Sequence, residues 1–151
     1  IFSFFNRETG THNFQSDKAI ESITSGGFFG KGIGEGVLKN RVPEAHTDYI
    51  ISVISEEFGV VAIMLILLLF LILIYMVFKK ISFETNDKVK LILIGSISLI
   101  LMQATIHVGV NIRLFPTTGM TLPFLSYGGS SIISTSILAG IILNLTKRKI
   151  T

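Results

Sequence analysis

One carboxylate in this sequence stands where it could act as a catalytic base. Asp48 ends the polar segment 43–48 and directly precedes residues 49–57, whose apolar side chains recur on one face of a predicted helix. A carboxylate within hydrogen-bond reach of a substrate hydroxyl can accept its proton. Asp48 or Thr47 could instead cap the helix, because their side chains accept hydrogen bonds from its first unpaired amides. From the residues alone we interpret this position as a helix cap, with a functional role for Asp48 as the alternative.

Two more ionisable side chains, Glu44 and His46, lie in the same segment. Together with Asp48 they match no recognised metal-binding spacing, so His46 is interpreted as a polar residue rather than a ligand. We therefore predict no cofactor, and the sequence does not decide whether a divalent cation is needed. The sequence has no Cys, which excludes disulfides and thiolate chemistry.

A second polar segment, 116–131, is rich in Pro, Gly and Ser and lies between two apolar stretches. Lipid cannot satisfy bare backbone groups, so irregular backbone beside membrane spans usually lines a site. The run 123–127 in its middle is too apolar for a solvated loop and fits a re-entrant turn that dips into a helix bundle. A purely structural role for this segment is equally open.

A third segment, 25–36, contains six glycines. It is not a Walker A loop, because Ser25 and Gly32 occupy the places that require Gly and Ser or Thr. No strand pattern precedes it, which excludes a dinucleotide-binding fold. Two interpretations remain: a loop packed on the membrane by Phe28 and Phe29, or backbone amides that hold an anionic ligand.

The elements that must position these residues are membrane helices. Hydrophobic residues make up 49% of the 151 residues and charged residues 15%, and the mean hydropathy is +0.67. Because a helix needs about 20 apolar residues to cross the hydrocarbon core, we predict an all-α polytopic membrane protein with three transmembrane helices. The uncharged stretches are 58–78, 91–112 and 130–146. Residues 1–57 are predicted to form a large loop with short helices, one over 17–23 with Asp17 as its cap.

The basic residues predict how these helices are oriented. The connection 79–90 has four Lys against two acidic residues, and the tail 147–151 has three basic residues, whereas 113–129 carries one Arg. By the positive-inside rule, 79–90 and 147–151 are cytoplasmic and 113–129 lies outside. Three spans put 1–57 outside too, where five basic and eight acidic residues give no cytoplasmic signature.

Polar side chains within the second apolar stretch share one helical face. They are Ser96, Gln103, His107 and Asn111. Such a stripe faces other protein or a water-filled cavity, because lipid makes it costly. We interpret it as interhelical hydrogen bonding. Glu56 and Glu57 are expected at a solvated helix end.

These motifs resemble the C-terminal part of the SEDS family of polytopic membrane glycosyltransferases, which includes FtsW, RodA and SpoVE. The resemblance is carried by Asn111 and by the segments 26–34, 43–50, 56–59 and 116–131. They are closer to the division member, FtsW, than to the elongation member, RodA. Family members have ten transmembrane helices, and this chain resembles the large loop after helix seven and helices eight to ten. Because it starts at Ile1 and shows no signal peptide, we expect a fragment of a longer protein.

The resemblance implies a peptidoglycan glycosyltransferase that polymerises lipid II into glycan strands outside the membrane, for septal wall synthesis during cell division. It places the family's essential carboxylate at Asp48, the base of a single inverting displacement that needs only one carboxylate. Glu44 and His46 would position Asp48 or the substrate. The leaving pyrophosphate needs cations or backbone amides. Candidate substrate-binding residues are therefore Lys31, Lys39, Arg41 and Arg113, with Ser126 and Tyr127 in the cavity wall.

The resemblance also implies partners and a location. The partners are the lipid II substrate, a class B penicillin-binding protein transpeptidase and other division proteins, and the location is the bacterial inner (plasma) membrane at the division septum. The net charge of +3 gives no sign of a nucleic-acid partner. A lipid II transporter and a noncatalytic membrane interaction fragment are the alternatives, and we expect this chain alone to be inactive.

Overall fold

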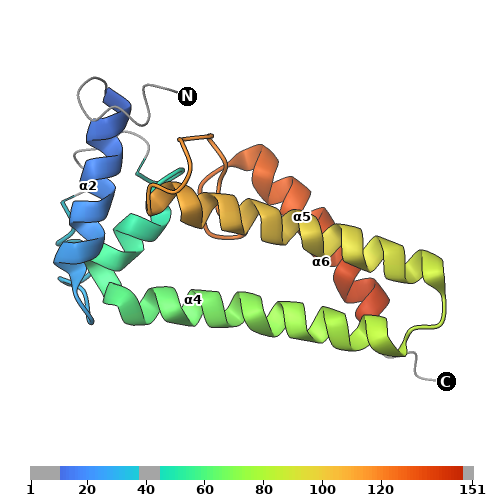
Figure 1. Cartoon of the computed structure of the whole chain (residues 1–151). Helices are drawn as coiled ribbons and strands as arrows, with labels where there is room; N and C mark the ends of the chain where they lie inside the picture. Colours follow the sequence, from blue (N-terminus) through green and yellow to red (C-terminus); the bar gives the residue numbers. More distant parts are fainter. Residues whose placement is uncertain (1–10, 38–44, 148–151) are drawn as a thin grey trace.

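The computed structural model describes residues 11–37 and 45–147, and over these ranges it is all-helical (Figure 1). Its helices are α2 (Thr11–Gly26), α4 (Ile50–Phe83), α5 (Asp87–Asn111) and α6 (Gly129–Thr146). The last three are, by length and composition, able to cross a membrane. The prediction of an all-α protein with three membrane-spanning helices is thereby confirmed.

The helices extend beyond the patterns that predicted them. α4 continues through Lys79 and Lys80 to Phe83, because Lys favours helix and its charge is stabilised near a helix C-terminus. Residues 84–86 then suffice to connect α4 to α5. α2 begins at Thr11, so Asp17 lies inside the helix. The prediction that Asp17 caps a helix is wrong, because residues 11–16 before it are already helical.

α4 and α5 run antiparallel, and α6 crosses α5 and reaches the C-terminal part of α4 (Figure 1). Their shared core contains Val77 from α4, Ile97 and Ile100 from α5, and Ile142 from α6, all nearly inaccessible to solvent. α2 lies crosswise over the start of α4, at the opposite end from the α4–α5 turn. The chain therefore has one polar end built from α2, the start of α4 and the end of α5.

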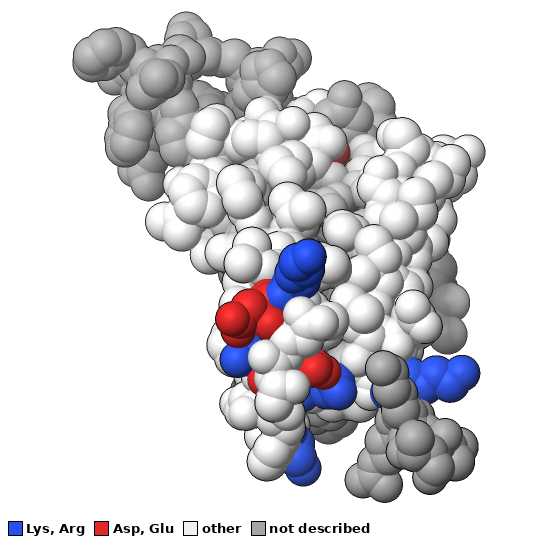
Figure 2. Space-filling view, turned by 90° about the vertical axis from the view of Figure 1, so that its right-hand side faces the viewer, with Lys and Arg blue, Asp and Glu red and all other residues white. Residues whose placement is uncertain are grey.

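Charged side chains gather at the other end, where α4 meets α5 (Figure 2). Two ion pairs form there, between Lys80 and Glu84 at 3.0 Å and between Lys90 and Asp87 at 3.4 Å. Almost all of the rest of the face seen in Figure 2 is uncharged. Separation of a charged end from an apolar belt is what a membrane-spanning arrangement requires.

α4 is broken at Gly59, where φ is 79° and ψ is −176°. This backbone conformation is essentially restricted to glycine. A break leaves amides and carbonyls unpaired on its two sides, which is costly at membrane depth. The glycine-rich loop supplies partners for both sides. The amides of Val60 and Val61 donate to the carbonyls of Gly27 and Phe28, at 3.0 and 3.4 Å.

The same loop satisfies the other side of the break. The amides of Lys31 and Gly32 donate to the carbonyls of Glu56 and Glu57, at 2.8 and 3.1 Å. These two loop amides therefore bind helix carbonyls, which favours the packing interpretation of the loop over an anion-binding one. The side chain of Phe29 points outward and is 85% exposed.

Glu56 was expected to be solvated at a helix end, but it is buried. It is 2% exposed, and its carboxylate pairs with the Lys31 ammonium at 3.0 Å. The expectation is wrong for Glu56 because the glycine-rich loop folds over this turn of α4 and brings a compensating positive charge with it.

Candidate active site

Asp48 lies at the polar end of the molecule, immediately before α4, and is 7% exposed. The N-cap of α4 is Tyr49, which makes no side-chain cap hydrogen bond. Asp48 therefore does not occupy the N-cap position of this helix. A buried carboxylate outside the cap position is a stronger candidate for chemistry than an exposed capping residue.

The backbone around Asp48 is held by hydrogen bonds to three consecutive carbonyls. The carbonyl of His46 accepts from the Tyr127 amide at 3.2 Å. The Thr47 carbonyl accepts from Ser126 Oγ at 2.9 Å and lies 3.2 Å from His107 Nε2. The carbonyl of Asp48 itself accepts from Asn111 Nδ2 at 2.9 Å. Donors from α5 and from the loop before α6 thus fix the segment that carries the carboxylate.

Ring nitrogen Nε2 of His107 must carry the proton in this arrangement, because its partner is a carbonyl oxygen that can only accept. The other ring nitrogen, Nδ1, faces the amide nitrogen of Asn111 at 3.4 Å. An unprotonated Nδ1 suits that neighbour, since a second N–H would point at an amide donor. His107 is fully buried and acts here as a neutral donor.

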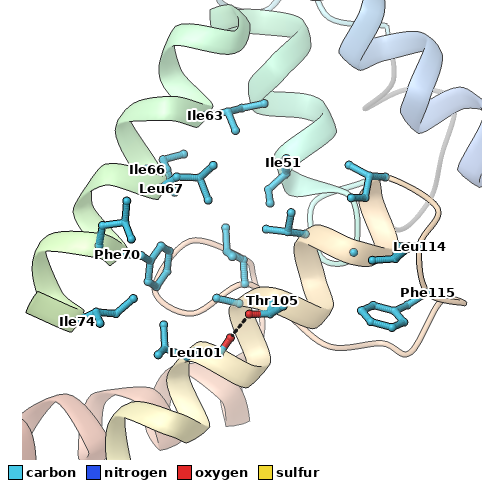
Figure 3. Close-up of a pocket in the computed structure, with 16 residues that line it drawn as sticks. Ile51, Ile63, Ile66, Leu67, Phe70, Ile74, Leu101, Thr105, Leu114 and Phe115 are labelled. Atoms are coloured by element: carbon cyan, nitrogen blue, oxygen red, sulfur yellow. Dashed lines mark hydrogen bonds between the residues drawn. The ribbon is translucent and has the colours of Figure 1, made fainter. Parts of the chain in front are cut away.

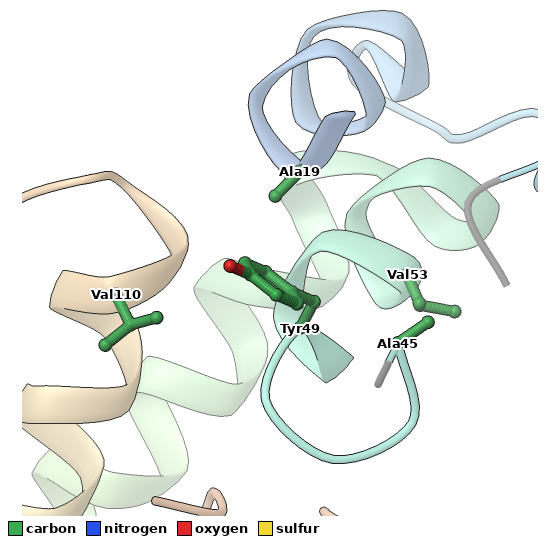
Figure 4. Packing of buried hydrophobic residues seen from close by; sticks show 5 residues of the cluster. All are labelled: Ala19, Ala45, Tyr49, Val53 and Val110. Atoms are coloured by element: carbon green, nitrogen blue, oxygen red, sulfur yellow. The ribbon is translucent and has the colours of Figure 1, made fainter. Parts of the chain in front are cut away.

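Tyr49 anchors the segment from the apolar side. Its side chain is fully buried, lies beneath Ala19 of α2 and directs its hydroxyl end toward Val110 of α5 (Figure 4). Ala45 and Val53 complete this cluster. A buried aromatic ring with contacts on three elements resists displacement, because any shift opens a cavity. The residue next to Asp48 therefore ties it to the packing of α2, α4 and α5.

The loop between α5 and α6 folds back into the molecule. Gln103 Nε2 donates to the Thr121 carbonyl and to Ser131 Oγ, both at 2.9 Å. Leu122 and Ser126 are buried, and the Leu122 amide donates to Ser126 Oγ at 2.9 Å. The loop therefore presents Ser126 to the Thr47 carbonyl by using hydrogen bonds of its own.

The polar stripe on α5 makes the hydrogen bonds expected of it. Gln103, His107 and Asn111 each bond to backbone or side chains of other elements. The prediction that the stripe provides hydrogen bonds between elements is confirmed for these three. Ser52 belongs to the same network but was not singled out from the sequence. Spacing gave no signal for it, because its partner Asn111 is 59 residues away in the chain.

The structure does not bring all predicted substrate-binding residues together. Arg113 forms an ion pair with Asp17 of α2, and Lys31 forms one with Glu56. Tyr127 is 79% exposed, and its backbone amide rather than its side chain contacts the segment before Asp48. His46 is exposed. Glu44, Lys39 and Arg41 lie outside the described residues, and the substrate-binding roles of all these residues stay predictions.

An apolar cavity of about 450 Å³ opens between α4, α5 and the loop after α5 (Figure 3). Ile51, one turn after Asp48, lines it together with Phe70 and Leu114. The hydroxyl of Thr105 bonds to the Leu101 carbonyl at 2.7 Å, within its own helix. The cavity wall is thus almost wholly apolar. Within residues 11–37 and 45–147, no cluster of three or more potential metal ligands occurs.

Comparison with known proteins agrees with these features. Residues 1–150 match the family FTSW_RODA_SPOVE, described as "Cell cycle protein". A relative from Enterococcus hirae, named "Probable peptidoglycan glycosyltransferase FtsW", is 39% identical over 91% of this chain and 35% of its own length. One of the same name from Trichlorobacter lovleyi is 41% identical over 97% of this chain and 39% of its own length.

A solved structure described as "Structural coordination of polymerization and crosslinking by a peptidoglycan synthase complex" is also similar. Its TM-score is 0.73 with 28% identity, over 96% of this chain and 39% of that one. The chain spans little more than a third of the length of the relatives it matches. With the family matched over nearly every residue and the fold shared, this chain belongs to the FtsW/RodA/SpoVE family.

Proposed function

We propose that this chain forms the catalytic wall of a peptidoglycan glycosyltransferase that polymerises lipid II on the outer face of the bacterial plasma membrane. The observation that carries the proposal is the buried Asp48, whose backbone is held by donors from two other elements. The names of the relatives support glycosyl transfer as the reaction. The activity is proposed for the whole protein, of which the relatives' lengths suggest this chain is one part.

In the proposed reaction, Asp48 takes the proton from the 4-hydroxyl of the acceptor sugar as that oxygen attacks the anomeric carbon of the donor. The new glycosidic bond forms while the bond from the anomeric carbon to the pyrophosphate breaks. Inversion at that carbon requires a single displacement and one general base. A carboxylate held by its backbone suits this role, because little reorganisation is needed when the hydroxyl arrives.

The leaving group and the lipid tail place further demands on the site. The pyrophosphate carries negative charge that cations must balance. Arg113 is a candidate cation because it follows Asn111 by two positions, and its partner in this structure is Asp17. The apolar cavity beside Ile51 could receive part of a polyprenyl chain, since its wall offers almost only carbon.

The same reasoning extends to partners and location. The similar solved structure is described as a complex that couples polymerization and crosslinking, which supports a transpeptidase of the class B penicillin-binding protein type as partner. The resemblance of the motifs to FtsW supports the division septum as the site of action.

The test is polymer formation by the purified full-length protein in detergent, with lipid II as substrate. Asp48→Asn should reduce the rate by about 100-fold or more, because an amide cannot accept the proton. Asp87→Asn is the matched control, since its carboxylate is exposed at the opposite end of α5. Near-normal polymer formation by the Asp48→Asn protein would contradict the proposal. A transporter would form no polymer in detergent, where no compartments exist.

A further inference from the structure

We propose that Asn111 is the positioning residue for Asp48, and that it acts by capping α4 from another helix. This inference rests on the proposed role of Asp48 as the base. Asn111 is the last residue of α5 and is fully buried, so it cannot touch a substrate. Its amide instead joins the end of α5 to the backbone of Asp48 and to the first turn of α4.

The amide group of Asn111 uses all of its hydrogen-bonding positions. Oδ1 accepts from the Ser52 amide at 3.2 Å and from Ser52 Oγ at 2.7 Å. Nδ2 donates to the carbonyls of Asp48 and His107, both at 2.9 Å. The reverse orientation would place an NH₂ group against the Ser52 amide and an oxygen against two carbonyls. The orientation of the side chain is therefore fixed by its partners.

The bond from the Ser52 amide to Asn111 replaces the side-chain hydrogen bond that the N-cap residue, Tyr49, does not make. In most helices the N-cap side chain accepts a hydrogen bond from the amide two or three residues later. Tyr49 makes no such bond, although the Ser52 amide is the third of α4. Asn111 provides the acceptor from α5, so the helix start does not require the carboxylate of Asp48 for this purpose.

One side chain thus fixes two things that catalysis would need. It holds the Asp48 carbonyl, which sets the position of the backbone that carries the carboxylate. It also caps the helix that follows, which keeps the first turn of α4 formed. The Asp17–Arg113 ion pair joins α2 to the same end of α5.

The test compares variants of the full-length protein in the detergent polymerisation assay. Asn111→Ala should lower kcat by roughly 10- to 100-fold while KM for lipid II stays within about threefold, because the base is misplaced but the substrate contacts remain. Ser52→Ala, which removes only the bond from Ser52 Oγ, should fold normally and lower kcat less.

Thr135→Ala is the matched control. It removes a buried polar side chain whose hydrogen bonds stay within α6, so none of them reaches residues 46–48 or the loop that holds them. A merely structural role for Asn111 predicts that Asn111→Ala and Thr135→Ala both lower the folded fraction, with kcat per folded molecule unchanged. That result would overturn the inference. If Asn111→Ala does not fold, an unchanged kcat for Ser52→Ala overturns it.

The outcomes separate this inference from the proposed function. If the Asp48→Asn protein is active, Asp48 is not the base, and both the proposed function and the positioning role of Asn111 fail. An inactive Asp48→Asn protein together with normal kcat for the Asn111 and Ser52 variants removes only the positioning role.

Discussion

A methyl group on Gly59 would lie 2.2 Å from the carbonyl oxygen of Phe28. This closeness shows how tightly the glycine-rich loop fits into the break in α4. The positive φ of Gly59 disfavours a side chain for a second, independent reason. The loop and the break are thus a single structural unit, which the following prediction tests.

Gly59→Ala should destabilise the full-length protein by about 1–3 kcal/mol, because the new methyl group forces the loop away from the break and strains the backbone. Thermal unfolding in detergent measures the change. Gly95→Ala is the control, since Gly95 lies within α5 and a methyl group there meets nothing within 4 Å. That variant should be neutral or more stable by up to about 1 kcal/mol. Equal melting temperatures for the two variants would contradict the prediction.

The ion pair between Lys31 and Glu56 should contribute to stability. Lys31→Met leaves a buried carboxylate without this cation and should cost about 1–2 kcal/mol, less than for a fully buried pair because the Lys31 side chain is 38% exposed. Adding Glu56→Gln should recover part of the loss in a double-mutant cycle measured by thermal unfolding. Lys18→Met serves as the control, because its partner Glu21 is largely exposed. Additive effects of the Lys31 and Glu56 changes would show that the pair is not coupled.

Arg113 could bind the pyrophosphate or hold α2 in place, and substituting its ion-pair partner Asp17 distinguishes these two roles. If Arg113 binds the pyrophosphate, Arg113→Ala should raise KM for lipid II by roughly tenfold, because a hydrogen bond to a charged group is lost. Asp17→Ala should then leave KM unchanged. Steady-state polymerisation kinetics of the full-length variants provide the measurement. A similar KM increase in both variants would instead assign Arg113 to holding α2 in place.

The predicted orientation of the helices can be tested by thiol labelling, since the sequence has no Cys. Thr118→Cys, in the loop between α5 and α6, should react with a membrane-impermeant maleimide added to intact spheroplasts. Thr85→Cys, in the α4–α5 turn, should react only after the membrane is permeabilised. Both residues are exposed, so burial cannot explain a difference. Any cysteines elsewhere in the full-length protein would be replaced first, and the reverse labelling pattern would refute the orientation.

Much of the fold was predictable because membrane-spanning helices can be recognised from short stretches of sequence. A run of about 20 uncharged apolar residues has few alternatives to a helix in lipid, where every backbone group must be paired. The stripe of Gln103, His107 and Asn111 was visible for a similar reason, since its members recur on one helical face. Helix ends were predicted less well, because Lys79 and Lys80 end an apolar pattern without ending a helix.

The sequence by itself determined the fold class, the three apolar helices, the polar stripe on α5 and the resemblance that singled out Asp48. Only the tertiary structure decided what each polar group contacts. It placed the glycine-rich loop in the break at Gly59 and buried Glu56 against Lys31. It also gave the Ser52 amide its acceptor, Asn111, from another helix. The physical reason is that these are pairings between residues far apart in the chain. Spacing along a sequence reports which face of a helix a residue occupies, but not which distant backbone group completes its hydrogen bonds.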